Sequence, residues 1–179
     1  MTHITLAVTG SISAYKAADI TSQLTKLGFE VKVLMTPSAQ KFIPPLTLQV
    51  LSTNQVELDV MMEDDPQRIE HIDIGKETDL FLVAPASANT IAKLAMGLAD
   101  NMVTSTALAL PQRTKKLLAP AMNTKMLDHP ATQRNLKLLQ DYGYQIIQPR
   151  EATLACGDQG SGALATVDTI IQAVKENCL

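Results

Sequence analysis

The sequence predicts a single α/β domain in which helices cover both faces of a doubly wound, Rossmann-like parallel sheet. Its 179 residues are the length of one domain, and they include no internal repeat, low-complexity tract or linker. Short apolar runs alternate with helical patterns along the whole chain. Because these runs are continuous rather than alternating, each strand is expected to be buried on both faces, as in parallel sheets.

The first half of the chain predicts two strands and the helix between them. Residues 4–8 and residues 31–35 are the two apolar runs. Between them, apolar residues recur at helical spacing, and Gly28 follows the last of them, where a helix C-terminal cap belongs. These apolar residues are Ala17, Ile20, Leu24 and Leu27.

The second half continues the alternation. Three further strands are predicted at residues 80–84, 116–119 and 144–147. Helices are expected over residues 89–97, over about 132–141, and along an apolar stripe at 167–174 that Thr166 can cap.

Composition excludes several classes of protein. Hydrophobic residues make up 46% of the chain and charged residues 18%, as in a globular protein in water. The net charge of −3 and the absence of a basic run argue against nucleic-acid binding. We expect neither a membrane partner nor a signal peptide, because no apolar run approaches membrane-spanning length and a strand begins at about His3. Cys156 and Cys178 are too few for a disulfide scaffold, so free thiols and a cytoplasmic location are expected.

Ligands of such sheets bind at the carboxyl ends of the strands, so the loops there are candidate sites. The first loop, residues 9–14, opens a helix and contains two serines and one glycine. Free N–H groups at a helix start suit a phosphate, whereas a dinucleotide fingerprint would need more glycines. A tight turn capped by Ser13 is the alternative.

The second loop, residues 85–90, also lies between a strand and a helix. Its small residues permit close approach of a ligand, and Ser87, Asn89 and Thr90 can donate hydrogen bonds. An ordinary helix cap is the alternative. Two such loops in one sheet favour a ligand that carries a phosphate.

Two later segments carry a polar amide and a thiol. Asn123 follows a strand and could bind a substrate carboxylate, although a helix cap is the favoured local interpretation. Cys156 lies in a segment with three glycines in six residues, which predicts a mobile loop with a reactive group on a lid. A surface loop with an incidental thiol is the alternative.

His71 lies between acidic neighbours and could act as a general base. On local grounds, a solvated side chain is the favoured interpretation. No metal site is expected.

Together these segments resemble the homo-oligomeric flavin-containing cysteine decarboxylase family over nearly the whole chain. The resemblance rests on segments 10–13, 85–90, 99–101, 120–126 and 155–162. Two places depart from the family pattern. Leu127 stands where the family commonly has Trp, and the histidine signature around His71 is loose.

The resemblance implies FMN as cofactor and a homotrimer, or a multiple of trimers, with the flavin near a subunit interface. It implies that the substrate contacts Asn123, Met126, Ala155 and Cys156, under a lid around residues 151–164. The residues that it implies for FMN are Gly10, Ser11, Ile12, Ser13, Thr36, Ser38, Phe42, Ser87, Ala88, Asn89 and Thr90.

The implied reaction converts 4′-phosphopantothenoylcysteine to 4′-phosphopantetheine in coenzyme A synthesis. A carboxylate beside a thiol-bearing carbon has no electron sink, so oxidation to a thioaldehyde must precede CO2 loss to an enethiol, which is then reduced. The implied roles are His71 as base, Asn123 as carboxylate anchor and Cys156 as proton donor in the reduction.

Three alternatives remain. A peptidyl-cysteine decarboxylase of lantibiotic maturation would stop at the enethiol and would not need Cys156. A flavin prenyltransferase should lack the segment 120–126, and a non-catalytic regulatory subunit would not need His71, Asn123 and Cys156.

Overall fold

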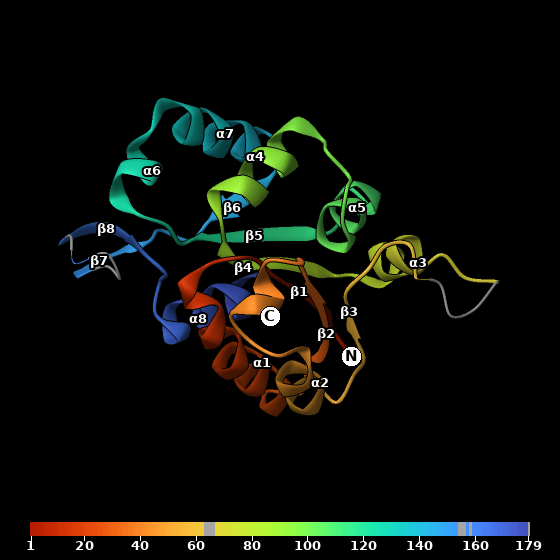
Figure 1. The fold of residues 1–179 in the computed structure, drawn as a ribbon. Helices are drawn as coiled ribbons and strands as arrows, with labels where there is room; N and C mark the ends of the chain where they lie inside the picture. Colours follow the sequence, from red (N-terminus) through yellow and green to blue (C-terminus); the bar gives the residue numbers. More distant parts are fainter. Residues whose placement is uncertain (63–66, 154–156, 158, 179) are drawn as a thin grey trace.

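In the computed structural model, six parallel strands form one sheet in the order β3-β2-β1-β4-β5-β6 (Figure 1). The structure describes residues 1–62, 67–153, 157 and 159–178. The strands are β1 (His3–Val8), β2 (Glu30–Met35), β3 (Val56–Glu57), β4 (Leu80–Ala86), β5 (Lys115–Pro120) and β6 (Tyr144–Ile146). The strand order reverses between β1 and β4, which is where a doubly wound sheet binds its ligand. The predicted fold class is confirmed.

Helices cover both faces of the sheet (Figure 1). On one face lie α1 (Ala17–Lys26), α2 (Pro45–Ser52) and α8 (Val167–Cys178). On the other lie α3 (Glu70–Glu77), α4 (Ala88–Met96), α5 (Met102–Ala109) and α7 (Pro130–Asp141). Short elements complete the chain: the 3-10 helices η1 (Ile12–Lys16) and η2 (Ala39–Lys41), and α6 (Thr124–Asp128). Within the described residues, none of the helices combines the length and apolar character that crossing a bilayer requires.

The two faces of the sheet bury separate hydrophobic clusters. Side chains alternate along each strand, so neighbours such as Leu6 and Ala7 enter opposite clusters. Leu82 and Val83 on β4 do the same, and all four residues are fully buried. Burial on both faces explains why these strands are continuous apolar runs in the sequence.

Several elements had no sequence signal strong enough to predict them. Strand β3 has only two residues and pairs with β2 at the sheet edge. Helix α5 begins with five consecutive buried residues, from Met102 to Thr106, so it has no amphipathic stripe. Its start is defined instead by Asn101, whose Oδ1 accepts a hydrogen bond from Thr104 N at 3.2 Å.

The segment predicted as an irregular glycine-rich loop contains a second, antiparallel sheet. Strands β7 (Arg150–Thr153) and β8 (Gln159–Ala163) form a hairpin, so the prediction of a loop is wrong for residues 159–162. Gly162 has φ +132°, and a Cβ there would lie 2.3 Å from the carbonyl oxygen of Met122. The glycine therefore allows β8 to pack against the loop after β5. Ala155 and Cys156 lie outside the described residues, and the mobility of a lid stays a prediction.

Candidate functional site

A cavity of about 500 Å³ opens at the carboxyl ends of the central strands. It is enclosed by the loop after β1, the start of α4, the loop after β5 and the β7–β8 hairpin. The predicted site residues that line it are Gly10, Ser11, Ile12, Ser13, Phe42, Ser87, Ala88, Asn123 and Met126. Residues from distant parts of the sequence therefore share one cavity, because parallel strands end at one edge of the sheet.

A second cavity of about 320 Å³ shares four of these residues. The shared residues are Gly10, Ser87, Ala88 and Met126. The second cavity adds the remaining predicted cofactor residues, Thr36, Ser38, Asn89 and Thr90. All the residues predicted to hold a flavin nucleotide therefore line one or both of two adjoining cavities. The volumes of these cavities are in the range typical of small-molecule sites.

Thr9 joins the two phosphate-type loops, a role that sequence reasoning missed. Its fully buried hydroxyl donates to Pro85 O at 2.6 Å and accepts from Ser87 N at 2.8 Å. These two bonds fix the end of β1 to the start of α4. A threonine directly after a buried strand was the available signal.

Serine side chains cap both helix starts that face the cavities. Ser11 Oγ accepts from Ser13 N at 3.3 Å, so the cap of η1 is Ser11, and the alternative of a turn capped by Ser13 names the wrong residue. Ser87 Oγ accepts from Thr90 N at 3.3 Å and caps α4, as the local alternative predicted. The first amides of each helix point away from the helix body, which makes such termini suitable for a phosphate.

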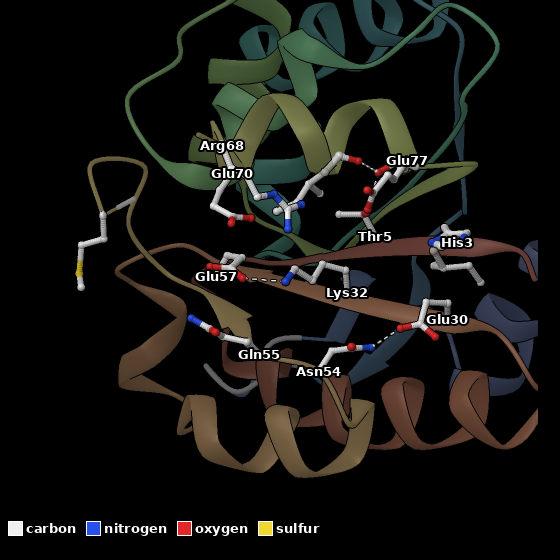
Figure 2. A pocket seen from close by; sticks show the side chains of 14 residues that line it. His3, Thr5, Glu30, Lys32, Asn54, Gln55, Glu57, Arg68, Glu70 and Glu77 are labelled. Atoms are coloured by element: carbon white, nitrogen blue, oxygen red, sulfur yellow. Dashed lines mark hydrogen bonds and ion pairs between the residues drawn. The ribbon is translucent and has the colours of Figure 1, made fainter. Parts of the chain in front are cut away.

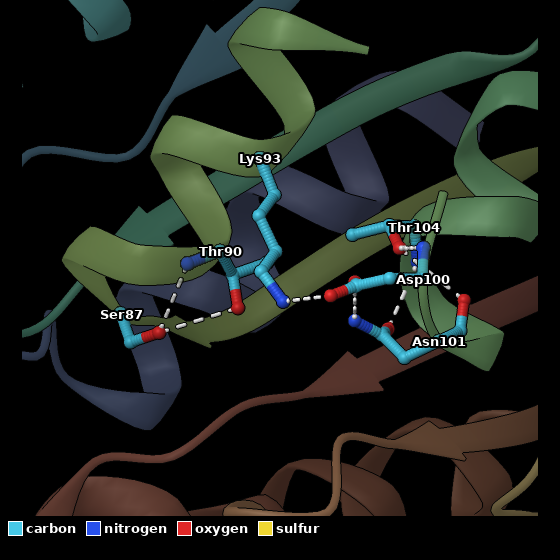
Figure 3. A network of polar contacts seen from close by, with 6 residues as sticks. All are labelled: Ser87, Thr90, Lys93, Asp100, Asn101 and Thr104. Carbon is cyan, nitrogen blue, oxygen red and sulfur yellow. Dashed lines mark hydrogen bonds and ion pairs between the residues drawn. The ribbon is translucent and has the colours of Figure 1, made fainter. Parts of the chain in front are cut away.

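A polar network forms the outer wall of the second cavity (Figure 3). Lys93 on α4 forms an ion pair with Asp100, which also accepts a hydrogen bond from Asn101 Nδ2 at 2.8 Å. The hydrogen bond from Lys93 is the main reason that the pKa of Asp100 lies below its usual range. Asp100 therefore neutralises Lys93, and the network ties segment 99–101 to α4.

Asn123 both lines the larger cavity and caps a helix. Its Oδ1 accepts a hydrogen bond from Lys125 N at 2.9 Å, so the predicted helix cap is present at the start of α6. This bond orients the amide and makes its Nδ2 group the end that can donate. Leu127, a residue of α6, is buried in the core, so its side chain packs behind this loop.

The structure does not bring His71 to these cavities. His71 lies on α3, which Figure 1 shows at the opposite side of the molecule from α6 and the β7–β8 hairpin. It is half-buried, and its Nδ1 is buried without a hydrogen-bond partner in the described part of the chain. The expectation of a simple solvated side chain is therefore wrong.

A third hollow, of about 440 Å³, lies beside α3 and the first halves of β1 and β2 (Figure 2). Its charged lining residues are Glu30, Lys32, Glu57, Arg68, Glu70 and Glu77. Four carboxylates against two cations disfavour a phosphate, and the position is the wrong end of the strands for a ligand of this fold. This hollow is therefore a poorer candidate for a phosphate-bearing ligand than the two cavities at the carboxyl ends of the strands.

A family model described as Flavoprotein matches residues 1–179. This chain belongs to the flavoprotein family. A Streptococcus mutans member named probable phosphopantothenoylcysteine decarboxylase is 65% identical, over 97% of each chain. The coenzyme A biosynthesis bifunctional protein CoaBC of Bacillus subtilis is 45% identical over 98% of this chain, which spans 43% of that longer protein.

Two solved structures of this flavoprotein type superpose closely. One, a PPC decarboxylase mutant complexed with pantothenoylaminoethenethiol, has a TM-score of 0.88 and 32% identity, covering 98% of this chain and 97% of the other. The other, the FMN-dependent cysteine decarboxylase SpaF, has a TM-score of 0.85 and 27% identity, covering 100% and 98%.

Proposed function

We propose that this flavoprotein uses FMN to decarboxylate 4′-phosphopantothenoylcysteine to 4′-phosphopantetheine in coenzyme A biosynthesis, in the cytoplasm. The observation that carries the proposal is the convergence of the predicted cofactor residues and Asn123 on two adjoining cavities. The name of the 65% identical relative supports the substrate, and the names of the structural neighbours support the cofactor.

The residues present fit FMN. Neutral donors at the starts of η1 and α4 suit a single phosphate, and the half-exposed side chains of Ile12, Phe42 and Met126 offer an apolar surface for a flat ring. Bound FMN would supply the hydride acceptor that makes the thiol carbon of the substrate an electron sink for loss of CO2.

The chain itself supplies binding, orientation and proton transfer. Asn123 would hold the substrate carboxylate through its amide N–H groups, which stay uncharged and so do not oppose the departure of CO2. We assign His71 as the base that removes a substrate proton during oxidation, and Cys156 as the acid of the reductive half. Ala155 and Met126 would contact the substrate beside them.

His71 lies outside the cavity that Asn123 lines, so the two residues can act together only in a site shared between copies, as in the expected homotrimer. If each cavity lies near a subunit interface, His71 of one copy can reach the cavity of its neighbour. Apolar side chains at the rim of the cavity support burial against another copy: Ile12 and Tyr15 are each 58% exposed, and Phe42 is 47% exposed. Nearby α2 adds Leu46 and Val50, which are 65% and 67% exposed.

Peptidyl-cysteine decarboxylation is the second candidate, favoured by the similarity to a solved structure named peptidyl-cysteine decarboxylase EpiD, with a TM-score of 0.80 and 28% identity. The two candidates differ in the fate of the enethiol, which only the coenzyme A enzyme reduces. Cys156 favours the first candidate, because an enzyme that stops at the enethiol does not need an acid for reduction.

We expect the purified protein to be yellow and to release FMN, not FAD, when it is denatured with acid. The reason is that the cavity residues include phosphate-type loops but no dinucleotide glycine fingerprint. Mass spectrometry of the released cofactor and release of labelled CO2 from the substrate test the proposal. Recovery of FAD, or failure to bind FMN at saturation, would contradict it.

Replacing Asn123 with Asp tests whether Asn123 binds the substrate carboxylate or serves only as a helix cap. As a carboxylate anchor, Asn123→Asp should raise the KM for substrate by at least ~10-fold, because two negative charges would face each other. As a helix cap alone, Asp serves as well as Asn, so activity and melting temperature should both be unchanged. Parallel measurement of KM and melting temperature decides between the two roles, and a fully active variant would remove Asn123 from the substrate site.

A further inference from the structure

Two cations, Lys16 and Arg150, line the larger cavity from opposite ends of the chain. Lys16 is the last residue of η1, and Arg150 is the first residue of β7. Neither forms an ion pair with any residue that the structure describes. The described lining of this cavity contains no carboxylate, so its charged side chains are positive.

The backbone holds Arg150 in place without neutralising it. Its Nε donates to Leu164 O at 3.2 Å, which fixes the side chain across the base of the β7–β8 hairpin. A carbonyl oxygen leaves the positive charge uncompensated, and the Nη groups are donors suited to a bidentate contact with a phosphate.

Lys16 lies close enough to Arg150 to be affected by its charge. Partial burial and the positive charge of Arg150 both lower the pKa of the Lys16 ammonium group. An anion placed between the two side chains would reverse this effect and would be attracted to both. Lys93, in the adjoining cavity, differs because Asp100 already neutralises it (Figure 3).

We propose that Arg150, together with Lys16, binds the terminal phosphate of the substrate and so selects phosphorylated over unphosphorylated pantothenoylcysteine. This inference rests on the proposed function and adds a specificity site to it. Each end of the substrate then meets a matching group: the carboxylate meets the neutral amide of Asn123, and the phosphate dianion meets two cations. The flavin phosphate is matched instead by the uncharged helix starts of η1 and α4, which Ser11 and Ser87 cap.

Removal of the guanidinium tests the site. For Arg150→Gln, we expect kcat/KM for the phosphorylated substrate to fall by about 10- to 100-fold, mainly through KM, as for a charged hydrogen bond to phosphate. For unphosphorylated pantothenoylcysteine, the change should be within about twofold, because no phosphate contact is lost. Lys16→Gln should also lower kcat/KM for the phosphorylated substrate. Arg150→Lys keeps the positive charge and should retain part of the preference for the phosphorylated substrate.

Arg113→Gln is the matched control. Arg113 is exposed, and it also donates to a backbone carbonyl, that of Lys76, but it is not among the residues lining either cavity. The substitution removes the same charge and the same kind of bond, so both substrates should be turned over as by the wild type. An equal loss on both substrates in Arg150→Gln would overturn the proposal.

Two binding measurements separate the possible sources of the phosphate. If these cations held the flavin phosphate instead, Arg150→Gln would lose affinity for FMN but not for riboflavin, and the proposal would be wrong. Calorimetry with 4′-phosphopantothenate and pantothenate gives a readout without turnover. Arg150→Gln should abolish the preference for the phosphorylated compound, whereas an unchanged preference would contradict the site. Failure of the wild type to decarboxylate either substrate would instead refute the proposed function.

Discussion

His71→Asn should abolish CO2 release while FMN stays bound. A positioned general base contributes about 10²- to 10⁴-fold to rate, and the oxidative half-reaction would lose that base. His71 does not line either cavity of its own chain, so cofactor content and melting temperature should be near those of the wild type. The assay is release of labelled CO2, with flavin absorbance as the measure of retained cofactor. Near-normal turnover in a variant that retains FMN would remove His71 from the mechanism.

Mixing His71→Asn with Asn123→Asp extends this test to the assembly, with the substrate held well below the raised KM of Asn123→Asp so that each variant alone has little activity. If each site combines His71 of one copy with Asn123 of another, trimers reassembled from equal amounts of His71→Asn and Asn123→Asp should contain wild-type pairs in about a quarter of their sites. Activity should recover to about that fraction. If both residues acted within one chain, mixing would restore no activity beyond the mean of the two separate proteins, and the shared-site proposal would fail.

The control experiment mixes Asn123→Asp with a variant of a second residue that lines the same cavity. Asn123 and Arg150 line one cavity of a single chain. Every cavity in a mixture of Asn123→Asp and Arg150→Gln therefore carries one altered residue, however the copies assemble, and no wild-type cavity can form. We expect turnover equal to the mean of the two separate proteins.

The parts of the fold that the sequence predicted are those specified by local patterns. Strands such as β1 and β4 are continuous apolar runs because both faces are buried. Gly28, which has φ +86°, directly follows the C-cap residue of α1, as the sequence predicted. Helix α5 has no such pattern, because its neighbours bury it on nearly all sides. The β7–β8 hairpin depends on contact of Gly160 and Gly162 with residues 122–124, and composition alone suggested a loop there.

The candidate site, too, could be predicted only in part from the sequence. The loops after β1, β4 and β5 could be placed together from topology alone, since parallel strands end at one sheet edge. The position of Arg150 beside Lys16 could not, because it depends on how the hairpin folds back over the cavity. The position of His71 on α3, away from both cavities, could not be predicted either, and its role in a site shared between copies stays a proposal.

Cys156→Ser should stop the reaction halfway. If the Cys156 thiol protonates the enethiol during reduction, the variant should still oxidise substrate and release CO2. A hydroxyl is a far weaker acid than a thiol, whose pKa is about 8.5, so the reductive half should stall. In a single turnover without oxygen, reduced flavin and the enethiol should then accumulate, whereas the wild type should return to oxidised FMN and yield 4′-phosphopantetheine.

Cys178→Ser provides the matched control for this thiol. Cys178 is a free, half-buried cysteine at the end of α8. Its pKa is raised, mainly by burial and in smaller part by the negative charge of Asp79. It lines neither cavity, so its replacement should leave both half-reactions intact. Mass spectrometry distinguishes the enethiol from 4′-phosphopantetheine by two hydrogens. Formation of 4′-phosphopantetheine by Cys156→Ser at the wild-type rate would show that another group supplies the proton, and Cys156 would then no longer separate this enzyme from the peptidyl-cysteine decarboxylases.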